Sequence, residues 1–135
     1  MHTLVIFTLL AMLDPTTSNA ASCGGAAPAI TTAIVKNVTP QGGLNHYQFA
    51  ITIVNNGSAQ ASNTLQSVDV YQNQQKLDAK SVPPLAAGQS YTVTYVSDRS
   101  RQAGDGTSKL TFKLDVHQSA TQTCNLANDT ASVTF

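Results

Sequence analysis

The chain has 135 residues and carries 7 Lys+Arg against 7 Asp+Glu, so its formal net charge is zero. This length suits one domain with a single hydrophobic core and leaves no room for two. A neutral chain without basic clusters argues against nucleic acid as a partner and offers no polybasic patch for anionic lipid. Glutamate is absent, and the polar residues are mainly Thr, Ser, Asn and Gln, which favours strands and turns over long helices.

The N-terminus resembles a secretory signal peptide. Residues 4–13 (LVIFTLLAML) form an apolar run that is too short to span a bilayer as a helix. Ser18 and Ala20 then place small residues where signal peptidase requires them, so we expect cleavage after Ala20. We therefore expect a periplasmic or extracellular protein, with no membrane insertion after cleavage. The expected division of the chain is a signal peptide over 1–20, a linker over 21–29 and one domain over 30–135.

Short segments after residue 29 alternate between apolar and polar side chains and end in turn clusters. This period of two is typical of half-buried strands, and no segment has the clear period of an amphipathic helix. The pattern predicts strands over 30–38, 46–54, 66–71, 76–82, 91–96, 109–117 and 130–135. About seven strands, each with one buried face, predict an all-β fold: an immunoglobulin-like sandwich of two antiparallel sheets.

The alternation also predicts which side chains form the core and where strands end. The residues expected to point inward are Tyr47, Phe49, Ile51, Ile53, Val68, Val70, Tyr91, Val93, Tyr95, Leu110, Phe112, Leu114 and Val116. Residues 55–58 (Asn-Asn-Gly-Ser) are expected to form a turn because Asn and Gly tolerate positive φ. The polar segment 76–82 carries two lysines, which predicts a strand at a sheet edge.

The longest predicted connection is the loop 97–108, which is polar and contains glycine. Long loops carry binding residues more often than short turns do, so this loop is the predicted contact surface. Its candidate contact residues are Asp98, Arg99, Arg101 and Asp105. The alternative interpretation is a flexible link without a binding role.

Two cysteines, Cys23 and Cys124, stand just before the first and the last predicted strands. In immunoglobulin-like sandwiches these strands commonly run parallel, so the residues before them meet at one end, and an exported chain favours a disulfide there. Closing a loop of this length contributes about 4–5 kcal/mol in the chain-entropy model. The rival interpretation is a lipobox with acylated Cys23, although Ala20 stands where leucine is usual and Cys124 would then lack a partner.

No residue pattern predicts catalysis, a cofactor or a bound metal. His46 and His117 stand at strand boundaries without the spacing of metal ligands. Asp98, Asp105 and Asp115 are candidates for a calcium site, but the loop lacks the alternating oxygen ligands of an EF-hand and contains two arginines. A Gly-x-Ser-x-Gly nucleophile turn is also missing, so we expect a protein that is not an enzyme.

Three segments in order resemble the CARDB family, the cell-adhesion-related domain found in bacteria. They are 51–57 (ITIVNNG), 85–90 (LAAGQS) and 125–130 (NLANDT), and the resemblance covers roughly residues 28–135. It implies an extracytoplasmic immunoglobulin-like sandwich that mediates contact or acts as a spacer, usually without catalysis. Cys124, Leu126 and Ala127 replace acidic residues of the family, which puts any calcium site carried over from it in doubt, and the tryptophan often found near Tyr95 is missing.

The expected function is therefore that of an exported, non-catalytic immunoglobulin-like module for protein–protein interaction or adhesion at the bacterial envelope. Its protein partners are not identified by the sequence. Two alternatives stay open: a small soluble ligand- or calcium-binding protein that uses the loop 97–108, and a lipid-anchored accessory protein of the envelope.

Overall fold

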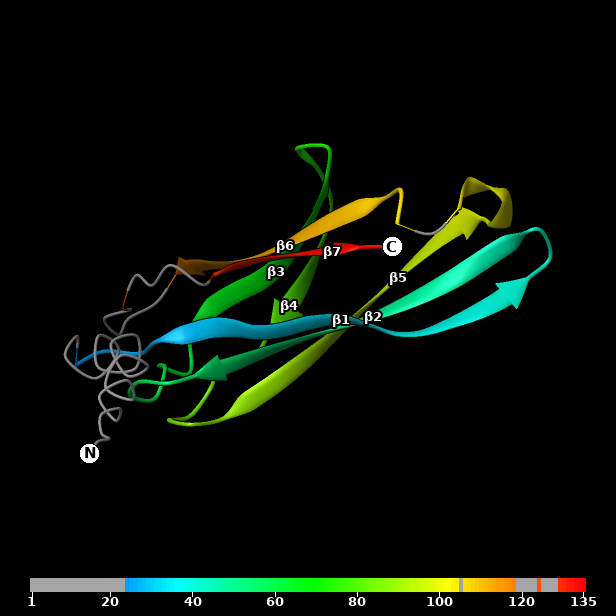
Figure 1. Cartoon of the computed structure of the whole chain (residues 1–135). Coiled ribbons are helices and arrows are strands. Elements are labelled where there is room, and N and C mark those ends of the chain that lie inside the picture. Colours follow the sequence, from blue (N-terminus) through cyan, green and yellow to red (C-terminus); the bar gives the residue numbers. More distant parts are fainter. Residues whose placement is uncertain (1–23, 105, 119–123, 125–128) are drawn as a thin grey trace, which may run out of the picture.

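The structure, a computed structural model, describes residues 24–104, 106–118, 124 and 129–135 (Figure 1). Its strands are β1 (Pro28–Gln41), β2 (Leu44–Asn55), β3 (Leu65–Gln72), β4 (Gln75–Val82), β5 (Ser90–Ser100), β6 (Lys109–Gln118) and β7 (Thr130–Thr134), and a short 3-10 helix, η1 (Arg101–Ala103), follows β5. They form a three-stranded sheet in the order β1-β2-β5 and a four-stranded sheet in the order β4-β3-β6-β7.

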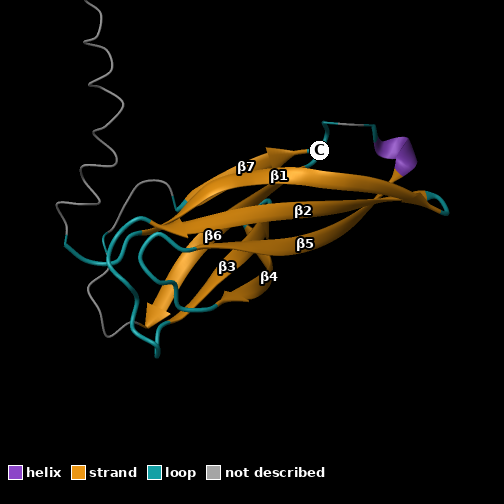
Figure 2. Cartoon of the chain, turned by 90° about the horizontal axis from the view of Figure 1, so that it is seen from below, coloured by secondary structure: helices purple, strands orange, loops and turns teal. Residues whose placement is uncertain are grey.

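The pairings between these strands are antiparallel, and Figures 1 and 2 show the two sheets as the layers of a sandwich. The predicted all-β sandwich is therefore confirmed, and β4 lies at a sheet edge as expected. Among the described residues, no helix has the length and apolar character needed to cross a membrane. The predicted signal peptide and residues 21–23 of the predicted linker lie outside the described residues.

The core lies where the inward faces of the two sheets meet. At its centre, the Phe49 ring of β2 lies 5.8 Å from the Phe112 ring of β6 and 5.0 Å from the Phe135 ring, measured between centroids. Most of the side chains predicted to point inward are buried: Tyr47, Phe49, Ile51, Ile53, Val68, Val70, Val93, Leu110, Phe112 and Leu114. Each large side chain buried in this way contributes about 1.5–3 kcal/mol.

Three predicted core residues are less buried: Tyr95 is half-buried and packs against the core, whereas Val116 and Tyr91 lie at the rim of the sandwich. Val116 is only half-buried, and Tyr91 is 38% exposed. Val116 and Tyr91 stand close to an end of their strands, where the opposing sheet covers less of the surface. The alternation predicted that these side chains point inward, but it does not show how far the opposing sheet extends over them.

The β1–β2 hairpin is longer than the sequence indicated. Pairing continues past the predicted end of the first strand to Gln41 and Leu44, so only two residues form the turn. Gly42 in this turn has a φ of 62°, a conformation that two-residue hairpin loops require and glycine adopts without strain. Pro40 is tolerated within β1 because β1 is an edge strand and needs no hydrogen bond on its second side.

The turn after β2 forms where it was predicted, but the predicted reason is wrong. Asn55, Asn56 and Gly57 do not have positive φ. Asn55 is instead fully buried, and its Oδ1 accepts hydrogen bonds from the Ala27 amide at 2.8 Å and from the Gly57 amide at 3.1 Å. Its Nδ2 donates to the main-chain oxygens of Ser58 at 2.8 Å and Leu85 at 3.1 Å. One side chain thus joins three chain segments.

Gly57 is required by a close approach of the backbone. A Cβ at this position would lie 2.1 Å from the main-chain oxygen of Gly25 and 2.8 Å from the amide nitrogen of Ala27. The segment before β1 therefore packs directly on the turn after β2, and only glycine leaves room for it.

The predicted loop 97–108 is largely ordered into secondary structure, which corrects the expected boundary. The ladder between β2 and β5 runs without a register shift from Val54 and Ser90 to Leu44 and Ser100. The long β2 arm of the hairpin supplies a pairing partner for polar residues that the sequence pattern assigned to a loop. What remains of the connection is η1 and residues 104–108.

Candidate functional site

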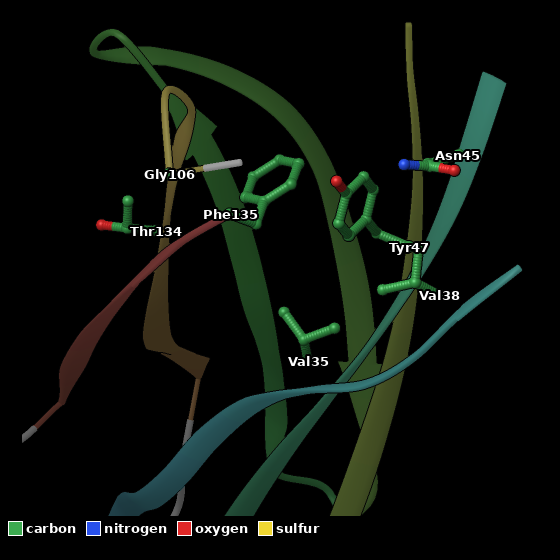
Figure 3. A pocket seen from close by; sticks show the side chains of 7 residues that line it. All are labelled: Val35, Val38, Asn45, Tyr47, Gly106, Thr134 and Phe135. Carbon is green, nitrogen blue, oxygen red and sulfur yellow. The ribbon is translucent and has the colours of Figure 1, made fainter. Parts of the chain in front are cut away.

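One end of the sandwich brings together the β1–β2 hairpin, the last residues of β5 with η1, and the end of β7. We call this region the hairpin end. A cavity of about 410 Å³ opens there (Figure 3), lined by Val35, Val38, Asn45, Tyr47, Gly106, Thr134 and Phe135. Because these residues come from both sheets, the cavity exists only when the sandwich is assembled.

Both apolar and polar side chains line the cavity. Figure 3 shows the Tyr47 and Phe135 rings side by side with Val35 near them. The two ring centroids are 4.8 Å apart in an edge-on arrangement, which aromatic pairs prefer. Val38 is 44% exposed, and Asn45 and Thr134 supply polar side chains. This composition fits an apolar or aromatic group that carries a hydrogen-bonding group at one end.

Arg99 is one of the predicted contact residues, but its side chain points into the sandwich. Its guanidinium carbon lies 5.4 Å from the centroid of the Tyr47 ring and 5.1 Å from that of the Phe135 ring. The guanidinium also donates hydrogen bonds to the main-chain oxygens of Phe135 and Gly104. Each cation–π contact of this kind contributes about 0.5–2 kcal/mol. Arg99 therefore holds in place the two rings that line the cavity.

Main-chain hydrogen bonds hold the end of β7 in the same region. The Ser108 amide donates to the Phe135 oxygen at 3.0 Å, and the Phe135 amide donates to the Ser108 oxygen at 2.8 Å. With the Arg99 contact, these bonds fix the backbone of Phe135 on both sides. The position of Phe135, one of the residues that line the cavity, is therefore fixed by contacts within the chain.

The other predicted contact residues lie around the hairpin end but do not converge on one point. Asp98 is on the outward face of β5 and its Oδ1 lies 2.5 Å from Nδ1 of His46, with both side chains partly exposed. Arg101 donates a hydrogen bond from its side chain to the main-chain oxygen of Gly42 and thus ties η1 to the hairpin turn. Asp105 lies outside the described residues.

The aspartates considered for calcium do not come together. Asp98 lies on the outward face of the three-stranded sheet, whereas Asp115 lies on the outward face of the four-stranded sheet opposite Ser67. Within the described part of the chain, no group of three or more His, Cys, Asp or Glu residues is arranged to hold a metal ion. The geometry gives the calcium-binding alternative no support.

A cluster that the sequence analysis missed lies on the outward face of the four-stranded sheet. Ser67 Oγ is 2.9 Å from Nε2 of His117, and Nδ1 of His117 is 3.3 Å from Oδ2 of Asp115. Ser67 Oγ also donates to Oδ1 of Asp69 at 2.7 Å, and Asp69 is nearly fully buried, with Lys76 Nζ 3.4 Å from its Oδ2. The order serine, histidine, aspartate is that of a hydrolase triad.

The surroundings of Ser67 do not suit catalysis. Its hydroxyl proton is directed at Asp69, so His117 is not placed to accept it. Ser67 is also buried in the middle of β3, which pairs with β4 on one side and β6 on the other, so neighbouring amides are engaged in the ladders and do not form an oxyanion hole. The cluster instead provides Asp69 with the hydrogen bond and the counter-charge that a buried carboxylate needs.

Cys124 is buried, and its amide donates a hydrogen bond to the main-chain oxygen of Ala26 at 2.7 Å. This bond places Cys124 beside the segment that precedes β1. Cys23, the predicted disulfide partner, lies outside the described residues, so the disulfide stays a prediction.

Comparison with known proteins gives one family. The family model described as CARDB matches residues 29–132, which is most of the chain. The match begins at the second residue of β1 and ends at the third residue of β7. No curated protein and no solved structure matches the chain.

Proposed function

The chain belongs to the CARDB family, and from this premise we propose that it is an exported, non-catalytic module that binds a protein partner at the bacterial envelope through its hairpin end. The observation that carries this proposal is the cavity at the hairpin end, which is lined by residues of both sheets, including Val38, Tyr47 and Phe135. Its family supports an adhesion-related role, and the predicted signal peptide supports export.

The cavity has the features of a site for one apolar anchor residue of a partner. Binding energy at protein interfaces concentrates where a large apolar side chain enters a well-packed pocket surrounded by polar groups. Val38 offers an exposed apolar surface above the nearly fully buried rings of Tyr47 and Phe135, and Asn45 and Thr134 offer hydrogen-bonding groups. Because Arg99 already fixes both rings, little side-chain entropy is lost when the anchor enters.

The test is affinity capture from envelope extracts of the parent cell with three forms of the mature protein. Val38→Asp places a charge at the mouth of the cavity, where Val38 is 44% exposed, and the partner recovered by the unaltered protein should be lost. Leu77→Asp is the matched control, since Leu77 is 45% exposed on β4 and does not line the cavity. Equal recovery by all three forms, or no reproducible partner at all, would contradict the proposal.

A further inference from the structure

Four strands in the described structure lie at sheet edges, and three of them carry features that prevent pairing with another strand. β1 has register shifts after Ile30 and after Val35 and contains Pro40. β4 has a register shift and is charged along its length, and β7 has only 5 residues. Bulges, prolines, charges and short length are the devices by which edge strands avoid association.

β5 has none of these features along most of its length. It is 11 residues long, pairs with β2 without a register shift and contains no proline. From Ser90 to Ser97 it is uncharged, and its sequence, SYTVTYVS, is rich in the β-branched and aromatic residues that favour strands. Tyr91 and Val96 are 38% and 42% exposed.

The hydrogen bonds at both ends of the β2–β5 ladder show which groups of β5 are free to pair. The Arg101 amide donates to the Gly43 oxygen at 3.1 Å, and the Asn55 amide donates to the Gln89 oxygen at 3.0 Å. In an antiparallel ladder every second residue exchanges hydrogen bonds with the partner strand, so odd-numbered residues of β5 face β2. The amides and carbonyls of Thr92, Thr94 and Val96 therefore point away from β2, toward the open edge.

We propose that the open edge of β5 pairs antiparallel with β5 of a second copy of this chain, with Thr94 opposite its own counterpart. The two three-stranded sheets then form one continuous six-stranded sheet across a twofold axis. The strand opposite is the same sequence, so the interface is isologous and closes as a dimer.

The side chains of β5 complement one another in this register. Thr94 faces Thr94, and Val93 faces Tyr95 of the second copy on the side of the cores, which gives a hydroxyl pair and two pairs of a β-branched with an aromatic residue. Asp98 faces Ser90, so no like charges are opposed. The formal net charge of the chain is zero, and copies approach one another without long-range repulsion.

The register also keeps the geometry of both sandwiches. Val93 and Tyr95 both point inward, so the cores of the two copies lie on the same side of the joined sheet. The new hydrogen bonds use main-chain groups that the monomer leaves to solvent, and they break none of the pairing with β2.

The experiment measures self-association of the mature protein by sedimentation equilibrium, with charge-swapped variants at the twofold position. Thr94→Lys and Thr94→Asp each place two like charges opposite one another across the twofold axis. Each should raise the dissociation constant of the dimer at least about tenfold, which corresponds to a loss of only about 1.4 kcal/mol of binding free energy. An equimolar mixture of the two variants should restore the dimer, because lysine then faces aspartate. Thr32→Lys is the matched control on the outward face of β1, the opposite edge of the same sheet, and should dimerise like the unaltered protein.

Hydrogen exchange provides a second measurement that needs no variant. The amides of Thr92, Thr94 and Val96 should exchange more slowly at high than at low protein concentration. Weak association is still detectable at protein concentrations up to about 1 mM. A protein that stays monomeric up to this concentration overturns the proposal. So does a mixture of charged variants that fails to recover the dimer, or a β5 edge that binds only a foreign strand.

Discussion

Replacing Asn55 tests whether one buried amide joins the segments at the end of β2. In Asn55→Ala the buried Ala27 amide loses its only hydrogen-bond acceptor in the described structure, at a cost of about 1–3 kcal/mol. The bonds to the Gly57 amide and the Ser58 oxygen are only partly buried, and losing each costs about 0.5–1.5 kcal/mol. The Leu85 oxygen keeps a second donor, the Gln60 amide, and adds little. The sum is a destabilisation of about 2–6 kcal/mol.

The assay is urea unfolding of the mature protein, compared with Asn56→Ala as a control. Asn56 is the exposed neighbour of Asn55, and its amide still donates to the Ala27 oxygen after the substitution. The control should change the free energy of unfolding by less than about 0.5 kcal/mol. A loss below about 1 kcal/mol for Asn55→Ala would refute the role assigned to this side chain, because a single net hydrogen bond accounts for that much.

Asn55→Asp refines the same test through pH. The aspartate keeps the acceptor for Ala27 but turns a second oxygen toward the carbonyls of Ser58 and Leu85. Burial and these two oxygens raise the folded-state pKa of the carboxyl above its unfolded value of about 3.9. A raised folded pKa means that the protonated form is favoured in the folded protein, so stability is greatest below pH about 4 and falls as pH rises. The deficit relative to the unaltered protein should therefore be smaller in acid; a deficit that grows in acid would contradict this geometry.

Two further predictions concern the cysteines and Tyr95. The mature exported protein should lose two hydrogens from its mass through a Cys23–Cys124 bond, and replacing both cysteines by alanine should lower stability by about 2–5 kcal/mol; added acyl mass at Cys23, or two free thiols, would contradict it. The pKa of Tyr95 is raised by burial and, to a lesser extent, by Asp78. Tyr95 therefore contributes stability below pH about 10 that is lost as pH rises through its folded pKa, and Asp78→Asn should move its phenolate absorbance to lower pH; an unchanged or upward shift would rule out the Asp78 contribution.

The sequence predicted correctly which side chains of a strand face the core. It did not predict contacts between segments that are distant in the chain. Phe49, Val70 and Phe112 were assigned to the core because alternation along a strand needs no knowledge of its neighbours. The roles of Asn55 and Gly57 were missed, because they depend on the approach of residues 24–27, which are distant in sequence.

The hairpin end and the polar cluster were missed for the same physical reason. Whether Ser67 meets His117 is decided by the register between β3 and β6, and a shift of one residue would separate them. Arg99 was predicted as a loop residue, because it falls in the polar, glycine-containing segment 97–108. In the structure β2 is long enough to pair with β5 as far as Ser100, so Arg99 belongs to a strand and its side chain points inward.

The two proposed surfaces lie on different parts of the sandwich and do not compete. Residues of β1, β2, β7 and the β5–β6 connection line the cavity. The pairing edge belongs to β5, which lies at the opposite edge of the three-stranded sheet from β1. Dimerisation through β5 therefore leaves both cavities open. If the proposed partner is present in many copies, a twofold dimer can attach to two of them, and bivalent attachment of this kind strengthens binding by about 10²–10⁴-fold without new contacts. The proposed dimer would in this way bring the cavities of two copies together for bivalent attachment.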